Sequence, residues 1–367
     1  MAALHLYKPD HAAPPGALLQ DYLTQLDISG RELARRCGRS PKLVAEILLG
    51  KAPVEPETAL QLERVLETSA AIWLGMEANY RLHLARTLEE PELAKHLEWA
   101  KSFPLKDLAK RGVLKISTDA ATQVRELLAF FGCGNVDACL ERFNELSAAA
   151  YRHSPSFASS DAGLLAWLRI GDLKAAQVEA TDFDRAKFIT ALKKIRRLTT
   201  EPPEVFLREL KRLCAEAGVV FLLEPALPKV ALSGVSRWLT PRRALIQQTA
   251  RHLANDHFWF TFFHECAHLL LHSRKDIFLD GKNLAHSDPE LEAEANDWAA
   301  DFLVPADAMT RFITRYTYDA NEIIAFAERQ GVAPGIVVGQ LQHRKVLPFS
   351  RMNDLKIYFK WDDASTS

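Results

Sequence analysis

The chain has 367 residues, of which 48% are hydrophobic and 25% are charged. This composition is typical of a folded globular protein, and the length predicts two or three domains. It excludes extended disorder, collagen-like repeats and low-complexity architecture. The 46 Lys and Arg residues nearly balance the 47 Asp and Glu residues, for a net charge of −1. Any nucleic-acid contact must therefore come from a local basic patch.

The sequence carries no signal for membrane insertion or export. We find no window of about 18 uninterrupted apolar residues, so we expect no membrane span and no membrane partner. The first residues, MAALHLYKPDHAAPPG, lack the charged stretch and apolar run of a signal peptide. The five cysteines are odd in number and form no CxxC pair. We expect reduced thiols and a cytoplasmic protein.

Helical periodicity dominates the first 200 residues and gives way to strands only once. A polar break interrupts the helical pattern at 153–163. After residue 204 a helix is closed by Gly218, and three short strands follow before helices return at 256. The expected fold is mainly α in the N-terminal and middle regions and α+β in the C-terminal domain. The predicted domains are 1–90, 91–200 (a helical connecting region) and 201–367.

Residues 29–51 have the layout of a helix-turn-helix. A short helix over Gly30–Arg36 runs into a turn at Gly38, and Ser40 then caps a second helix. Residues 31–51 hold six basic and two acidic side chains, although the surrounding helical unit is balanced in charge. The positive charge therefore lies on one face of the unit.

In helix-turn-helix folds the start of the second helix reads base edges, and flanking cations contact phosphates. This pattern predicts that the unit binds DNA. The alternative is a helical protein-interaction domain with a solvated basic face. The predicted contacts are Arg35, Arg36 and Lys51 with phosphates, and Arg39, Ser40 and Lys42 with bases.

The strongest chemical signal is an HExxH motif, in which His264 and His268 flank Glu265. Histidines at i and i+4 share one helix face and can bind one zinc ion, and the glutamate can act as general base on a bound water. The segment FWFTFFHECAHLLLH is apolar on nearly all sides, so the helix should be buried. Buried polar side chains need a partner, which a metal supplies. The alternative is a pair of hydrogen-bonded core histidines.

A catalytic zinc usually takes a third protein ligand, and the helix in SDPELEAEANDWAADFLVP can supply it. Ser287 or Asp288 is expected to cap this helix. Glu294 is the acid nearest to its apolar stripe at helical spacing, so we predict Glu294 as the third ligand. The stripe consists of Leu291, Ala295, Trp298 and Phe302, and the acids left on a solvated face are Glu290, Glu292 and Asp297.

Other residues near the motif give weaker signals. Cys266 points about 200° away from His264, so we expect it in the core. His272 lies one further turn along and is expected to support the site rather than ligate. His343, in GQLQHRK, is a candidate electrophilic group of the catalytic cleft. Trp238 and RALIQQTA are candidates for an edge strand that pairs with an extended substrate.

The segments HECAHLLLH and EAEANDWAADFLVP resemble the ImmA/IrrE family of zinc metallopeptidases, and the resemblance spans roughly 200–345. That family has HExxH and a glutamate just before Ala-Asn on the following helix. The resemblance implies a gluzincin-like domain with a small β-sheet beside the zinc helices. It implies His264, His268 and Glu294 as zinc ligands and Glu265 as the general base.

The N-terminal unit resembles the HigA-type antitoxin branch of the XRE regulators, which have a lambda repressor-like fold. The shared features are the Gly-Lys after the second helix, the PETAL helix start and the ending AAIWLGMEANY. The resemblance implies a homodimer that binds a palindromic operator, often its own promoter, and a toxin partner where the gene belongs to such a pair. Cys37 and Arg39 replace residues that are commoner at this turn in the HigA branch. The operator sequence that the branch prefers therefore cannot be assigned to this chain.

Together these features predict a transcriptional regulator with a zinc-dependent endopeptidase domain that hydrolyses a regulatory protein in response to stress. One alternative is a non-catalytic antitoxin or autorepressor whose peptidase-like domain binds or senses a ligand. Another is an enzyme whose helical front serves only for dimerisation.

Overall fold

The computed structural model describes residues 12–150, 162–249, 251, 254–274, 277–281, 288–315 and 318–359. The chain divides into two compact units. Unit 1 comprises Met1–Leu97 and Thr118–Val124, and unit 2 comprises Glu98–Ser117 and Arg125–Ser367. Most of the polar break expected at 153–163 and the expected cap Ser287 lie outside the described residues. Among the described helices, none combines the length and apolar character that a membrane span requires.

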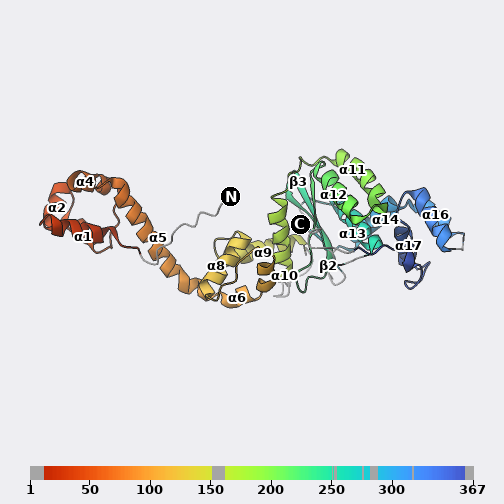
Figure 1. The fold of residues 1–367 in the computed structure, drawn as a ribbon, viewed down its shortest axis with the longest axis horizontal. Coiled ribbons are helices and arrows are strands. Elements are labelled where there is room, and N and C mark those ends of the chain that lie inside the picture. The colour runs from red at the N-terminus through yellow and green to blue at the C-terminus, as the bar shows by residue number, and fades with distance from the viewer. Residues whose placement is uncertain are drawn as a thin grey trace. The chain divides into compact units, whose positions relative to one another are not determined.

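Unit 1 is helical and contains the expected helix-turn-helix (Figure 1). The Ser29 hydroxyl accepts a hydrogen bond from the Glu32 amide at the start of α2, and Gly38 ends this helix with φ +62°. The Ser40 hydroxyl accepts from the Leu43 amide at the start of α3. The turn at Gly38 and the start of the second helix at Ser40 thus lie where the sequence signals predict. The helices are α1 (Pro15–Gln25), α2 (Gly30–Cys37), α3 (Pro41–Leu48), α4 (Pro56–Leu66) and α5 (Ala70–Ala94).

A small apolar core holds the helix-turn-helix in place. Leu33 of α2, Ile47 of α3 and Trp73 of α5 are at most 2% exposed and belong to one cluster. Gly16 allows α1 to approach α3, because a Cβ at this position would lie 2.3 Å from the Ile47 carbonyl oxygen. The orientation of α3 is therefore fixed by packing.

The middle helices run from α6 to α12. Among them, α10 ends at Ala175. Gly218 follows α12 with φ +82°, as its expected role at the helix end requires. The elements are α6 (Leu97–Lys101), α7 (Leu105–Lys110), α8 (Ala120–Phe131), α9 (Val136–Ala150), α10 (Ala162–Ala175), α11 (Arg185–Arg197), η2 (Leu198–Thr200) and α12 (Pro203–Ala215).

A four-stranded mixed sheet forms the centre of unit 2, in the order β1-β3-β2-β4. β1 and β3 are parallel, and β2 pairs antiparallel with β3 and with β4. The first three strands were expected from the sequence, but the four-residue β4 was not. Because β3 is paired on both sides, RALIQQTA does not offer the free edge proposed for it. The strands are β1 (Val219–Leu223), β2 (Leu232–Thr240), β3 (Arg243–Gln248) and β4 (Phe278–Gly281).

Both faces of this sheet are covered by helices. Val219 and Phe221 of β1 face the main core with α11–α13, whereas Val220 and Leu222 pack with Ala175 of α10. α10 is held by polar contacts as well as by packing. Arg237 of β2, which is 6% exposed, donates to Asp172 at 2.6 Å and to the Leu168 carbonyl at 2.7 Å. Residues of the predicted connecting region therefore form one face of the C-terminal unit.

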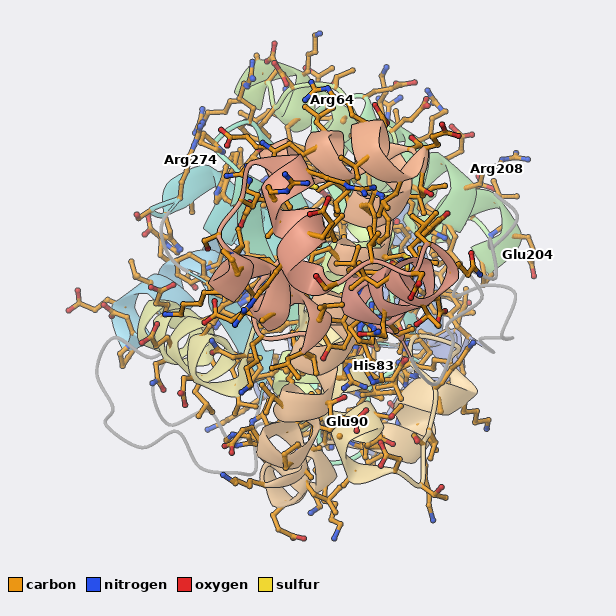
Figure 2. The ribbon with its side chains drawn as sticks, turned by 90° about the vertical axis from the view of Figure 1, so that its left-hand side faces the viewer. Arg64, His83, Glu90, Glu204, Arg208 and Arg274 are labelled. Atoms are coloured by element: carbon orange, nitrogen blue, oxygen red, sulfur yellow. The ribbon has the colours of Figure 1, made fainter. Side chains whose placement is uncertain are left out.

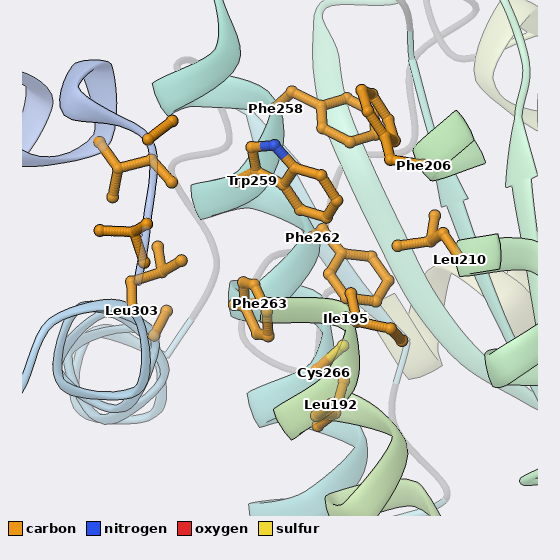
Figure 3. Close-up of a cluster of buried hydrophobic side chains, with 14 of the residues drawn as sticks. Leu192, Ile195, Phe206, Leu210, Phe258, Trp259, Phe262, Phe263, Cys266 and Leu303 are labelled. Atoms are coloured by element: carbon orange, nitrogen blue, oxygen red, sulfur yellow. The ribbon is translucent and has the colours of Figure 1, made fainter. Parts of the chain in front are cut away.

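The last elements surround α13, the helix that carries HExxH. Phe258, Trp259, Phe262 and Phe263 of α13 are at most 1% exposed and form the centre of the main core together with Phe206 of α12 (Figure 3). This packing confirms the expected burial of the helix. The elements are α13 (Asn255–Leu271), α14 (Pro289–Leu303), α15 (Ala306–Ile313), α16 (Ala320–Gln330), α17 (Pro334–His343) and η3 (Asn353–Leu355).

A buried ion pair joins the C-terminal segment to the start of α13. Lys356 Nζ lies 2.6 Å from Asp256 Oδ2, and both side chains are 7% exposed. Gly339 of α17 leaves room for this carboxylate, because a Cβ there would lie 2.6 Å from the same oxygen. The pair fixes the N-terminal end of the helix that carries the candidate site.

Asp256→Ala should lower the free energy of unfolding of unit 2 by about 3–5 kcal/mol, because it leaves the Lys356 ammonium buried without its counter-charge. Urea unfolding followed by fluorescence measures this loss. The control is Asp307→Ala, which removes an exposed pair with Arg311 and should cost about 0–1 kcal/mol. Equal losses in the two variants would show that the buried pair does not stabilise the helix start.

Candidate functional site

The two motif histidines of α13 lie side by side in the interior. Their Nε2 atoms are 2.9 Å apart, and the residues are 3% (His264) and 2% (His268) exposed. Burial lowers the pKa of His268 to about 2, with further contributions from His264 and His272. The imidazole of His268 is therefore neutral at physiological pH, which is the form that binds a metal.

The acid that reaches these histidines is Glu292 of α14, and the prediction of Glu294 as the third member is not matched by the structure. Glu292 Oε2 lies 3.3 Å from His264 Nε2, and Oε1 lies 3.6 Å from His268 Nε2. Among the described residues, ligand atoms of these three side chains lie within 4.8 Å of one another. The Glu294 side chain is 57% exposed and contacts His272 instead.

The difference follows from which face of α14 is buried. The buried residues are Ala295, Ala299 and Leu303, whereas Trp298 of the predicted stripe is only partly buried. At about 100° per residue, Glu292 lies within about 20° of Ala299 and Leu303 around the helix axis. Glu294 lies about 140° from Ala299, so its side chain points away from the histidine pair and reaches His272 instead. The Asp288 carboxylate caps the helix by accepting from the Glu290 amide.

The three side chains fit a zinc ion in donor chemistry and spacing. Two imidazoles and one carboxylate form a common ligand set for catalytic zinc. A tetrahedral zinc with bonds of about 2.0–2.1 Å holds its ligand atoms roughly 3.3–3.4 Å apart. The observed separations of 2.9, 3.3 and 3.6 Å bracket this value. His264, His268 and Glu292 are therefore the residues that would hold the ion.

Glu265 is fully buried beside the histidines and lies against the backbone of β2. A Cβ at Gly234 would lie 2.8 Å from Glu265 Oε1 and 3.0 Å from Thr261 Cγ2. The absence of a side chain at Gly234 thus makes the space that this carboxylate fills. The sequence offered no signal for this role of Gly234, because the clearance depends on how β2 packs on α13.

The other residues named from the sequence have clear positions. Cys266 is fully buried in the main core, as expected, and burial raises the pKa of its thiol. His272 contacts His268 and Glu294, in line with a supporting position. His343 is exposed at the end of α17, a helix that meets α13 near Asn255 and Asp256. The structure therefore does not bring His343 to the histidine pair.

The helix-turn-helix presents several cations on its surface. The Arg35 and Arg36 side chains are 79% and 47% exposed, and both contact Glu32 at 2.9 Å. Their hydrogen bonds lower the pKa of Glu32 to about 2. Exposed pairs within one helix are worth little, so both arginines can exchange Glu32 for a phosphate group at small cost.

Some side chains near the start of α3 are exposed to solvent, and others form hydrogen bonds within the unit. Lys42 is 84% exposed at its side chain, and Lys51 is also exposed. Ser40 uses its hydroxyl for the helix cap. Arg39 is 23% exposed and donates to Gln61 and Glu57 of α4 at 2.6 and 3.0 Å. In this arrangement the Arg39 guanidinium connects the turn before α3 to α4 by hydrogen bonds and is not presented to solvent.

The fold and the sites define a helix-turn-helix unit joined to a unit of the HExxH type. Residues 230–341 match Peptidase_M78, the IrrE N-terminal-like domain family. The chain is also 35% identical over 68 residues to the uncharacterized HTH-type transcriptional regulator YddM of Escherichia coli K12. That alignment covers 18% of this chain and 72% of YddM. The chain belongs to the HTH-type transcriptional regulators and joins an XRE-type unit to an ImmA/IrrE-type domain.

Solved structures of antitoxins are also similar to part of this chain. The Pseudomonas aeruginosa antitoxin HigA, solved with the higBA promoter, is 28% identical over 22% of this chain and 90% of its own, with a TM-score of 0.22. An addiction module antidote protein of the HigA family from Coxiella burnetii is 27% identical over 23% of this chain and 94% of its own, also with a TM-score of 0.22.

Glu292→Gln should lower the zinc content of the purified chain well below the one ion expected for the wild type, because the third, anionic ligand is removed. Elemental analysis after dialysis measures the ratio. Glu290→Gln is the matched control, since it removes the same charge from an exposed position of the same helix. A wild type that stays empty when supplied with zinc would contradict the assignment of the site.

Proposed function

We propose that this chain is a transcriptional regulator whose C-terminal unit is a zinc-dependent endopeptidase that hydrolyses a regulatory protein. The observation that carries the proposal is the convergence of His264, His268 and Glu292 beside the buried carboxylate of Glu265. Polar side chains inside an apolar core are costly unless they are compensated, so packing alone does not explain this set. Its presence supports a chemical role.

The residues of the chain have separate tasks in this reaction. When bound, zinc supplies a Lewis acid that polarises a peptide carbonyl and lowers the pKa of bound water to about 7. Glu265 takes a proton from the attacking water and returns it to the leaving amine. Gly234 keeps this carboxylate close to β2, so its position is set before the substrate arrives. His264, His268 and Glu292 would hold the ion.

Because the two units are part of one chain, we infer that the substrate is a regulatory protein. A peptidase covalently linked to an operator-binding unit has a raised effective concentration near any protein at the same DNA. We therefore propose that the substrate is a protein that acts at the operator. A toxin partner stays a prediction of the resemblance to the HigA branch.

The DNA contacts are proposed from exposure and charge on the helix-turn-helix. Lys42 is the exposed cation at the start of α3, the part of the helix that enters the major groove in this motif. Arg35, Arg36 and Lys51 are proposed as phosphate contacts. Arg39 acts by holding α3 on α4. A homodimer on a palindromic operator is the expected assembly.

Glu265→Gln is expected to lower peptide hydrolysis by roughly 10²–10⁴-fold with zinc retained, because the amide keeps the shape of the side chain but cannot take the proton. The assay is cleavage of a quenched fluorescent peptide library by the zinc-loaded full chain. Gly234→Ala should also reduce cleavage, because it displaces the carboxylate. Gly75→Ala is the control, since a Cβ there meets nothing within 4 Å.

If the wild type and Glu265→Gln cleave equally, the peptidase reaction is wrong. The non-catalytic regulator, in which this domain only binds or senses, would then be the better description.

Replacing Arg35 and Arg36 together by Ala should weaken binding to the DNA upstream of the gene. It should also lower the slope of the logarithm of the binding constant against the logarithm of the salt concentration, by about one for each phosphate group that the protein no longer neutralises. Fluorescence anisotropy between roughly 50 and 200 mM salt measures both quantities. Arg64→Ala is the control, because this arginine is exposed on α4 and projects outward from the unit (Figure 2). Absence of wild-type binding at low salt would overturn the operator proposal.

A further inference from the structure

We infer that His272 and Glu294 are positioning residues, which form a hydrogen-bonded relay behind His268 and fix the tautomer that turns its Nε2 lone pair toward the metal. The inference rests on the proposed zinc site. It assigns a role to Glu294, which was expected as a ligand, and to His272, the residue that follows α13.

The relay is a chain of two short contacts. His268 Nδ1 lies 2.8 Å from His272 Nδ1, and His272 Nε2 lies 3.1 Å from Glu294 Oε2. The His272 side chain is 3% exposed, whereas that of Glu294 is 57% exposed. The chain therefore runs from solvent at Glu294 to the buried histidine pair.

The direction of each hydrogen bond follows from donor chemistry. An ionised carboxylate only accepts, so His272 Nε2 carries the proton in its bond with Glu294. An imidazole that carries its proton on Nε2 has an acceptor at Nδ1, so this tautomer of His272 accepts at Nδ1 from His268 Nδ1. The proton of neutral His268 then sits on Nδ1, and the lone pair sits on Nε2. That atom is the one that lies 2.9 Å from His264 Nε2 and 3.6 Å from Glu292.

The same geometry excludes His272 as a ligand of this ion. Both of its ring nitrogens are engaged, one with His268 and the other with Glu294. No lone pair is left for a metal. A carboxylate that orients a metal-bound histidine through its second nitrogen is a general device of metal sites, and here one more imidazole extends it.

The face of the His268 ring is held as well. The Phe278 ring of β4 stacks on it with centroids 4.1 Å apart and an angle of 14° between the planes. The edge of His268 is thus fixed by His272 and its face by Phe278. The ring has little freedom to rotate away from the position that points Nε2 at Glu292.

The direct test reads the tautomer of the zinc-free full chain. ¹⁵N-histidine NMR should show His268 protonated at Nδ1 in the wild type. His272→Leu removes the acceptor and should populate the other tautomer, and His272→Asn should restore the wild-type form because its amide oxygen can accept. Glu294→Gln, at an exposed position that should not affect folding, should shift the population less than His272→Leu.

The second readout is the rate at which zinc leaves the protein into excess chelator. His272→Leu should release zinc about 10–100-fold faster than the wild type, and Glu294→Gln should release it faster by a smaller factor. Zinc stoichiometry should remain near one per chain in both variants, in contrast to Glu292→Gln. Glu290→Gln should match the wild type in rate and tautomer.

The outcomes separate this inference from the proposed function. Unchanged zinc release and an unchanged tautomer in His272→Leu and Glu294→Gln would overturn the relay while leaving the zinc site intact. Loss of stoichiometric zinc in Glu294→Gln would overturn it too, because Glu294 would then be a ligand. A wild type that binds no zinc would remove the proposed function, and the tautomer measurement would still decide whether the relay exists.

Discussion

The burial of three polar side chains inside an apolar helix is the constraint on which the C-terminal unit depends. His264, Glu265 and His268 are each at most 3% exposed, and their neighbours on α13 are mostly aromatic or aliphatic. Such groups are costly in a core unless they are compensated. The surroundings provide compensation from different elements: the Glu292 carboxylate of α14, the His272 ring at the end of α13 and the space that β2 leaves at Gly234. The fold is organised around these partners.

Small residues make this organisation possible. Gly234 lets β2 pass directly beside the Glu265 carboxylate. Ala295 and Ala299 form the buried face of α14, so this helix comes close enough for a side chain one turn earlier to reach both histidines. Gly339 does the same for Asp256 at the start of α13. The close packing of the helices and the strand therefore also sets the geometry of the site. A larger side chain at one of these small residues would displace a polar side chain of the site as well as the backbone.

Local signals in the sequence were sufficient for much of this structure. The caps at Ser29 and Ser40 are decided within a few residues, and so is the histidine pair at i and i+4. Glu292 was not predictable in the same way. Two apolar stripes run along α14, and the sequence favoured the one with the larger side chains, Trp298 and Phe302. In the structure the buried residues are Ala295, Ala299 and Leu303, whereas Trp298 and Phe302 are only partly buried. β4 has only four residues and no alternating pattern, so its pairing with β2 depends on tertiary contacts.

Contacts between residues far apart in the sequence also decide which residues belong to the C-terminal unit. The family match covers 230–341, but the sheet also includes β1, which precedes the match, and a second apolar face of the sheet is formed by Val220, Leu222 and Leu245. α10 covers this face, and Arg237 of β2 is buried against Asp172 of that helix. β2 is also the strand whose Gly234 lies under Glu265, and its side chains alternate between the two faces. The helix before the family match therefore supports the strand that lies against the Glu265 carboxylate. The predicted connecting region therefore contributes α10 to the packing of the C-terminal unit and does more than connect that unit to the helix-turn-helix.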